Sequence, residues 1–136
     1  MDRAEVRLTV PASPDYLACA RVTGASLASL LEFSYDEVED LRLAVDEVCF
    51  ALIGSQPGSL TGPAKLRVVY TISDGQIEVV GSVQGVPEWG ARLSGLARRI
   101  LSVLVDTYEL RPGTDTEPSS IWIVKAISGT CRTEAE

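Results

Sequence analysis

Residues 34–54 read SYDEVEDLRLAVDEVCFALIG, and this stretch decides the fold. Ser34 followed three residues later by Glu37 is a capping box, which marks the start of a helix. Beyond it, apolar side chains recur three or four positions apart, as they do on one face of a helix: Val38, Leu41, Val45, Val48 and Leu52. Gly54 is the residue type that commonly ends a helix. The sequence therefore predicts an amphipathic helix with one face in the core.

On the N-terminal side of this helix, the pattern predicts one strand and one further helix. Residues 5–10 alternate apolar and polar side chains, which is typical of a strand. Ser13 followed by Pro14 is a helix-start signal, because serine caps the helix and proline suits its first position. Apolar side chains then continue at helical spacing, so we expect a helix from Ser13 to Glu32.

On the C-terminal side, the pattern predicts a hairpin, a helix and two more strands. Residues 65–73 and 76–83 read as strands, and Asp74-Gly75 between them is a strong hairpin signal. Residues 107–111 and 119–127 read as strands as well. A third amphipathic helix is predicted from one apolar set: Leu93, Leu96, Ala97, Ile100, Leu101 and Leu104.

This order of elements predicts an α+β fold in one domain, residues 1–136, with a frayed tail at 129–136. We expect a two-layer sandwich, in which three helices pack on one face of a mostly antiparallel five-stranded sheet. Strict alternation of strands and helices is absent, so a doubly wound parallel sheet is a poor fit.

Composition narrows the class of protein. The chain has 12 basic and 19 acidic residues, a net charge of −7 and no histidine. This balance disfavours direct nucleic-acid binding, and the lack of histidine disfavours imidazole catalysis and most zinc sites. We therefore expect no metal site. No apolar run is typical of a signal peptide or a membrane span. The odd number of cysteines, Cys19, Cys49 and Cys131, is typical of a protein in a reducing compartment. We therefore expect a cytoplasmic protein.

Glu47 is the one candidate catalytic residue that the helix pattern offers. It lies opposite the apolar stripe, with Leu43 and Phe50 beside it. A carboxylate on an apolar rim can serve as a desolvated general base. Glutamates on helices are more often solvated. Position alone favours the solvated interpretation.

The runs LRLAVDEVC (41–49) and GLARRILSVLVDTYEL (95–110), with the element order, resemble the anti-sigma-factor serine/threonine kinases of the RsbW and SpoIIAB type. These kinases belong to the GHKL ATPase superfamily. The first run is especially similar to the actinobacterial, UsfX-like branch. The resemblance spans almost the whole chain and implies the GHKL (Bergerat-like) version of the predicted sandwich.

The resemblance assigns nucleotide roles to particular positions. In the family, a helical Glu-x-x-x-Asn box supplies a glutamate that polarises a nucleophile and an asparagine that holds Mg²⁺. Glu47 matches the glutamate and is the expected catalytic position, whereas Ala51 replaces the asparagine. Because a methyl group offers no oxygen to a hard cation, the magnesium ligand is missing.

Two further boxes of the family also depart from its pattern. Val83 stands where an aspartate reads the adenine amine, although Gly85 keeps the next glycine. In the phosphate-binding turn Gly95 is kept and Ala97 replaces the second glycine. Arg98 beside it could favour an anion or be a solvated side chain. These substitutions predict a degenerate ATP site, so we expect no cofactor, with ATP and Mg²⁺ only if the site functions.

By resemblance we expect an anti-sigma-factor-like regulator in a stress response, which binds a sigma factor and an anti-anti-sigma factor and forms a homodimer. Arg21 on the first helix and Trp89 in the loop at 86–94 are the candidate partner-binding residues; Trp89 could equally cap a pocket. An active serine/threonine kinase is the alternative, with Glu47 as its base. A non-catalytic scaffold in a partner-switching complex is the further alternative.

Overall fold

The computed structural model describes residues 3–54, 64–85 and 91–127. Within them, five strands form one sheet in the order β1-β2-β3-β5-β4, and every neighbouring pair is antiparallel. The strands are β1 (Ala4–Pro11), β2 (Lys65–Ser73), β3 (Gln76–Gln84), β4 (Thr107–Arg111) and β5 (Ser120–Ala126).

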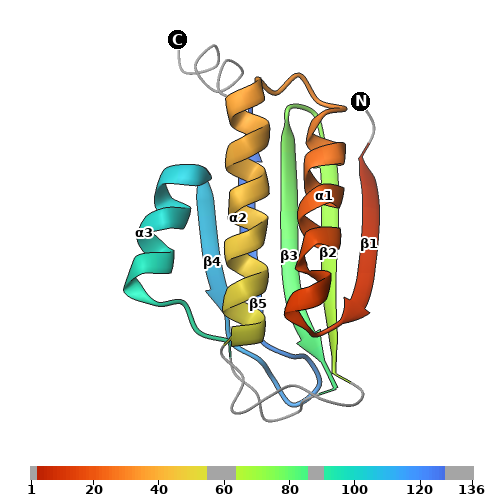
Figure 1. Ribbon diagram of the computed structural model, residues 1–136, viewed down its shortest axis with the longest axis vertical. Helices are drawn as coiled ribbons and strands as arrows, with labels where there is room; N and C mark the ends of the chain where they lie inside the picture. Colours follow the sequence, from red (N-terminus) through yellow and green to blue (C-terminus); the bar gives the residue numbers. More distant parts are fainter. Residues whose placement is uncertain (1–2, 55–63, 86–90, 128–136) are drawn as a thin grey trace.

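The helices lie together on one face of this sheet (Figure 1). They are α1 (Leu17–Ala28), α2 (Tyr35–Gly54) and α3 (Gly95–Leu104), and a short 3₁₀ turn, η1 (Pro14–Tyr16), precedes α1. The predicted α+β sandwich is confirmed. The tail predicted at 129–136 and the part of the predicted 86–94 loop that carries Trp89, residues 86–90, lie outside the described residues.

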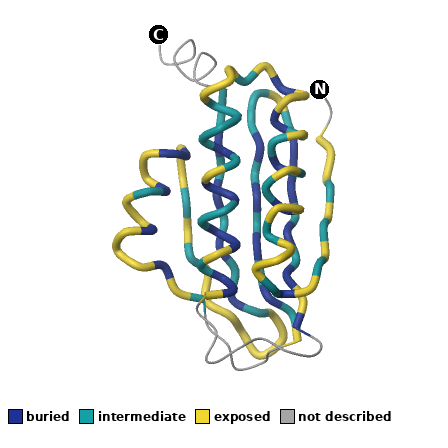
Figure 2. The backbone as a smooth tube through the Cα atoms, viewed as in Figure 1, coloured by how far each residue is buried: buried dark blue, intermediate teal, exposed yellow. Residues whose placement is uncertain are grey.

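The core lies between α2 and the middle of the sheet. Four of the five residues in the predicted apolar stripe are fully buried, and Val38 packs partly buried at its start: Leu41, Val45, Val48 and Leu52. Gly81 of β3 lies directly beneath α2, because a Cβ there would stand 2.7 Å from Leu52 Cδ1. Figure 2 shows the resulting contrast between the buried central strands and the exposed outer side of the helices.

Two local signals are confirmed in detail. Both reciprocal hydrogen bonds of the capping box form: Ser34 N donates to Glu37 Oε1 at 2.8 Å, and Glu37 N donates to Ser34 Oγ at 3.1 Å. The hairpin turns at Asp74-Gly75, where Gly75 has a φ of 72°, a conformation that favours glycine. These features depend on neighbouring residues, so sequence alone locates them well.

The predicted limits of two helices are wrong. Helix α1 ends at Ala28, four residues before Glu32, because the amides of Leu30 and Leu31 bond to carbonyls three residues back instead of four. Its start also differs, since Ser13 caps the turn η1. Helix α3 starts at Gly95, so Leu93 precedes it, and Leu96 is exposed rather than part of its core face.

Candidate nucleotide cavity and the α1–α2 face

Glu47 and Ala51 lie one turn apart on α2 and face α3 across an open cavity of about 870 Å³. Glu47 is half-buried. Its burial lies between that of a desolvated general base and that of a solvated surface glutamate, the two interpretations that the sequence left open. The cavity wall is mainly apolar and comes from α2, from α3 and from the residues before α3: Glu47, Phe50, Ala51, Gly54, Arg92, Leu93, Ser94, Leu96, Ala97 and Ile100.

The first turn of α3 is capped by Ser94. Ser94 Oγ accepts a hydrogen bond from Ala97 N at 3.0 Å, and the Ser94 carbonyl accepts one from Arg98 N at 3.0 Å. A Cβ on Gly95 would meet nothing within 4 Å, so packing does not require glycine there. One of the first-turn amides that a phosphate could use, that of Ala97, is therefore already bound within the chain, whereas the Arg98 amide makes an ordinary helical bond.

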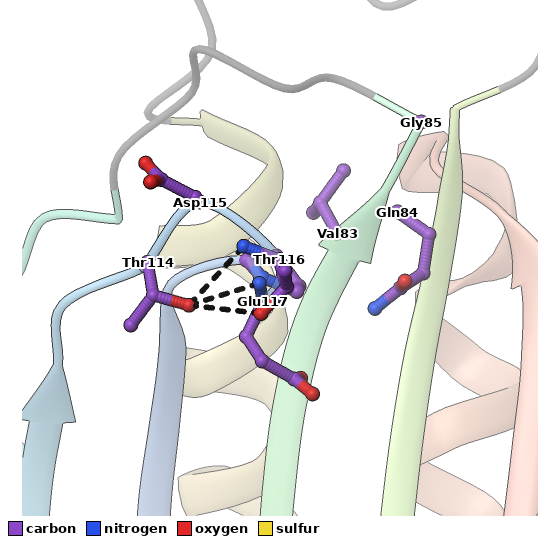
Figure 3. Close-up of a pocket in the computed structure, with 8 residues that line it drawn as sticks. Val83, Gln84, Gly85, Thr114, Asp115, Thr116 and Glu117 are labelled. Atoms are coloured by element: carbon purple, nitrogen blue, oxygen red, sulfur yellow. Dashed lines mark hydrogen bonds between the residues drawn. The ribbon is translucent and has the colours of Figure 1, made fainter.

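Val83 and Gly85 lie at the end of β3, in a different pocket of about 310 Å³ (Figure 3). Val83 is fully buried, and Gly85 has a φ of 89°, so the turn after β3 favours glycine. The opposite wall is the loop 114–118, where Thr114 Oγ1 accepts from the amides of Thr116 and Glu117 at 3.3 and 3.1 Å.

The two pockets have no lining residue in common among those described. The structure thus brings Glu47, Ala51 and Ala97 to one cavity. It places Val83 and Gly85 at another. Arg98 is exposed on α3 and lines neither.

Arg21, the predicted partner-binding residue, makes an ion pair across the α1–α2 interface. Its Nη1 lies 3.2 Å from Asp46 Oδ1, and both side chains are about one-third exposed. The helices can approach here because Gly24 of α1 packs against Val45 of α2, where a Cβ would stand 3.3 Å from Val45 Cγ2. Trp89, the second candidate, is among the residues that are not described.

The described residues do not fit a bound magnesium ion. No group of three or more Asp, Glu or Cys side chains gathers in the part of the chain that the structure describes. In the α2 cavity the residue facing inward one turn after Glu47 is Ala51, whose methyl group cannot ligate a cation.

Cys49 lies on the core side of α2. It is fully buried, and this burial raises its pKa to about 12. Cys19 on α1 is exposed.

The cavity rim carries one apolar residue that the sequence pattern placed correctly and one that it did not. Phe50 and Leu96 are 61% and 68% exposed and line the cavity from α2 and α3. The sequence predicts Phe50 beside Glu47, whereas it assigns Leu96 to the apolar face of the third helix. Leu96 directly precedes Ala97 and so lies to one side of the buried face formed by Ala97, Leu101 and Leu104.

Comparison with known proteins supports the resemblance. The chain is 28% identical over 87 residues to the serine-protein kinase RsbW of Bacillus cereus, and likewise to that of Bacillus thuringiensis. It is similar to RsbW. The matched region covers 63% of this chain and 53% of the relative, so it spans about half the length of the curated relatives. No family model matches the chain.

A solved structure shares the fold. It contains the RsbU and RsbW domains of a Mycobacterium tuberculosis protein, and it matches 91% of this chain with a TM-score of 0.70 and 10% identity. This chain covers 32% of that protein. Among the described helices, none combines the length and the apolar character needed to cross a membrane.

Proposed function

We propose that this chain is an anti-sigma-factor-like regulator of the RsbW type that acts by binding proteins. Its partners are a sigma factor and an anti-anti-sigma factor, and its ATP site is degraded. The observation that carries the proposal is the α2–α3 cavity, where a family kinase needs metal and phosphate ligands. Here Ala51 provides a methyl group, and the Ala97 amide is bound to Ser94.

The apolar rim supports the same proposal. Phe50 and Leu96 project beside Glu47 at the mouth of the cavity. Exposed apolar side chains grouped around a hollow favour contact with a protein more than with a triphosphate. Arg98 is too exposed to be counted as a built phosphate ligand.

Thermal unfolding tests whether nucleotide binds. A ligand at 100 times its Kd stabilises a fold by about 2.7 kcal/mol, which raises the melting temperature by several degrees. We expect no shift with millimolar ATP and Mg²⁺, whereas a Bacillus cereus RsbW kinase is the positive control. A clear magnesium-dependent shift for this chain would refute the degraded site.

We propose that the partner-binding surface includes Arg21 on α1. Its neighbour in sequence, Val22, and Leu30, just beyond the end of α1, are exposed apolar side chains, at 58% and 67%. A partly exposed arginine near exposed apolar side chains is a common anchor at protein interfaces. Arg21→Ala should therefore weaken binding to the sigma factor that co-purifies from the protein's own cell extract.

The Asp46→Ala variant distinguishes a direct contact between Arg21 and the partner from an effect of the internal Arg21–Asp46 ion pair. If Arg21 contacts the partner itself, Asp46→Ala should keep the affinity, because it removes only the internal ion pair. Arg99→Ala on α3 is the control for a lost positive charge. Equal losses in all three variants would remove Arg21 from the surface.

The second candidate is an active serine/threonine kinase. One observation favours it: Glu47 is half-buried beside a cavity of about 870 Å³, within the usual 300–1,000 Å³ of small-ligand sites. In that case Glu47→Gln should abolish phosphorylation of an anti-anti-sigma substrate while the fold stays intact. A scaffold without a sigma-factor partner is the further alternative, which co-purification separates from the regulator.

We also propose that residues 1–136 form one domain and that the protein is a homodimer. We propose a cytoplasmic location, without direct contact to nucleic acid. The acidic net charge of −7 suits a basic protein partner better than a phosphate backbone.

A further inference from the structure

Helix α3 carries two apolar stripes, and only one of them is buried against the core: Ala97, Leu101 and Leu104. Leu96, Ile100 and Val103 follow at spacings of four and three residues, so they form a second stripe along one side of the helix. Leu96 and Val103 are 68% and 81% exposed, and Ile100 is half-buried. This second stripe is therefore accessible to a partner.

Helix α2 carries a stripe with the same spacing. Leu43, Glu47 and Phe50 are four and three residues apart, and the two apolar side chains are 46% and 61% exposed. Seven residues of helix span about 10 Å, which is the distance between the first and last anchors of a helix docked in a groove. Each stripe thus has the length and the spacing of one wall of a helix-binding groove.

The two stripes border one groove, because α2 and α3 pack side by side in opposite directions (Figure 1). The start of α3 and the end of α2 share the cavity of about 870 Å³. At the other end Lys125 links the two helices, since its Nζ lies 2.8 Å from the Leu104 carbonyl oxygen and 3.9 Å from Asp40 Oδ2. The groove therefore continues beyond the cavity, towards Leu43 on α2 and Val103 on α3.

Glu47 supplies a negative charge in the middle of this groove. It is half-buried, and within the described residues no hydrogen bond or ion pair neutralises it. Arg92 also lines the cavity, but it already has an interaction within the chain. Four other acidic side chains of α2 have partners of their own: Glu37, Glu39, Asp40 and Asp46. A partly buried carboxylate among apolar side chains is stabilised by pairing with a basic group.

We propose that the α2–α3 groove binds an amphipathic helix of a partner protein, with a lysine or arginine in the middle of its apolar stripe. The apolar side chains of that helix lie between the two stripes, and its basic group pairs with Glu47. The net charge of −7 favours the approach of such a partner. This groove deepens the proposed function and rests on it, because a bound nucleotide would fill the same cavity.

Two labelled helical peptides test the groove by fluorescence anisotropy with the full chain. Both carry leucines at helical spacing, and they differ only in the middle of the apolar stripe, where one has lysine and the other glutamate. A peptide of the same composition in scrambled order is the control for non-specific binding. We expect the lysine peptide to bind about tenfold more tightly than the glutamate peptide, and the scrambled peptide not to bind.

Charge reversal shows whether Glu47 selects the basic group. Glu47→Lys should invert the preference, so that the glutamate peptide binds more tightly than the lysine peptide. Melting temperatures show that the variant is folded. A Glu47→Lys protein that still prefers the lysine peptide overturns the proposed pairing.

Removal of apolar side chains tests the two ends of the groove. Leu96→Gln should weaken both peptides severalfold, and Leu30→Gln is the matched control, since these leucines are 68% and 67% exposed. Val103→Gln should also weaken both peptides, because the groove extends beyond the cavity, whereas Val22→Gln on α1 should not. Equal effects in the groove variants and their controls would contradict the location.

The failure of this groove is distinguishable from the failure of the regulator. If neither peptide binds, or if both bind equally, the groove proposal is overturned. The regulator stands in that case, provided that the co-purified sigma factor still binds the wild type and loses affinity on Arg21→Ala. A magnesium-dependent thermal shift with ATP would instead refute the degraded site on which the groove rests.

Discussion

Gly81→Ala tests the closest approach between α2 and the sheet. The new methyl carbon would stand 2.7 Å from Leu52 Cδ1 and 3.1 Å from Val48 Cγ1, where ordinary contact begins at 3.4 Å. Leu52 would have to retreat by about 0.7 Å. Both neighbours are fully buried, so they have no free space in which to rotate.

The expected cost follows from two opposing effects. Overpacking of a core costs about 1–3 kcal/mol, and the loss of glycine freedom in the unfolded chain returns about 0.4–1 kcal/mol. We therefore expect Gly81→Ala to lower the free energy of unfolding by about 1–2 kcal/mol. For a domain of this size that is a fall of roughly 4–8 °C in melting temperature.

Chemical and thermal denaturation measure this effect, and two variants serve as controls. Gly95→Ala should stabilise the chain slightly, because a Cβ there meets nothing within 4 Å and alanine favours the helix. Leu52→Val should relieve part of the clash, so Gly81→Ala with Leu52→Val should cost less than the two single changes together. A Gly81→Ala protein as stable as wild type would refute the close contact of α2 with β3.

Four further predictions concern a buried hydrogen bond, a helix cap and the two described cysteines. Tyr70→Phe removes the 2.7 Å hydrogen bond from Tyr70 Oη to the Ala20 carbonyl, and urea denaturation should show a loss of about 1 kcal/mol; no loss would contradict the bond. Ser34→Ala should cost about 1 kcal/mol by removing the cap of α2, and a smaller helical circular-dichroism signal before unfolding should accompany it. Burial raises the Cys49 pKa from 9.0 to about 12, so the folded state keeps this proton while the unfolded state loses it. Stability should accordingly fall above pH 9 by at most about 1.4 kcal/mol per pH unit from this thiol, and Cys49→Ala should flatten the decline. Exposed Cys19 should react with a thiol reagent in the native state and Cys49 only on unfolding; equal rates would contradict the burial.

Sequence reasoning succeeded where the signal is local or periodic. The Ser34–Glu37 capping box, the Asp74-Gly75 turn and the apolar stripe of α2 each depend on a few neighbouring residues or on one repeat length. These features fix α2 and the β2–β3 hairpin, which together hold the centre of the fold.

The helix limits and side-chain contacts that the sequence did not predict depend on the three-dimensional structure. Helix α1 ends where the amides of Leu30 and Leu31 change to bonds three residues back, and leucine does not mark a helix end by type. The Arg21–Asp46 ion pair requires the relative rotation of two helices, which the Gly24 contact sets in three dimensions.

The candidate site likewise has one part that the sequence predicted and one part that it did not. Glu47 and Ala51 share a cavity because helical spacing puts them on one face, as the sequence indicated. The separation of Val83 and Gly85 into a second pocket follows from the position of the loop 114–118, which forms its opposite wall. Spacing along the sequence carries no information about the position of that loop.

Calorimetric titration of the pure protein with ATP and with ADP, each with and without Mg²⁺, shows directly whether the nucleotide site is degraded. We expect no binding heat at millimolar nucleotide, because the α2–α3 cavity lacks a metal ligand at Ala51 and its first-turn amide at Ala97 is already bound. Magnesium-dependent binding with a Kd below about 100 μM, roughly −5.5 kcal/mol, would contradict it and make the kinase the leading function.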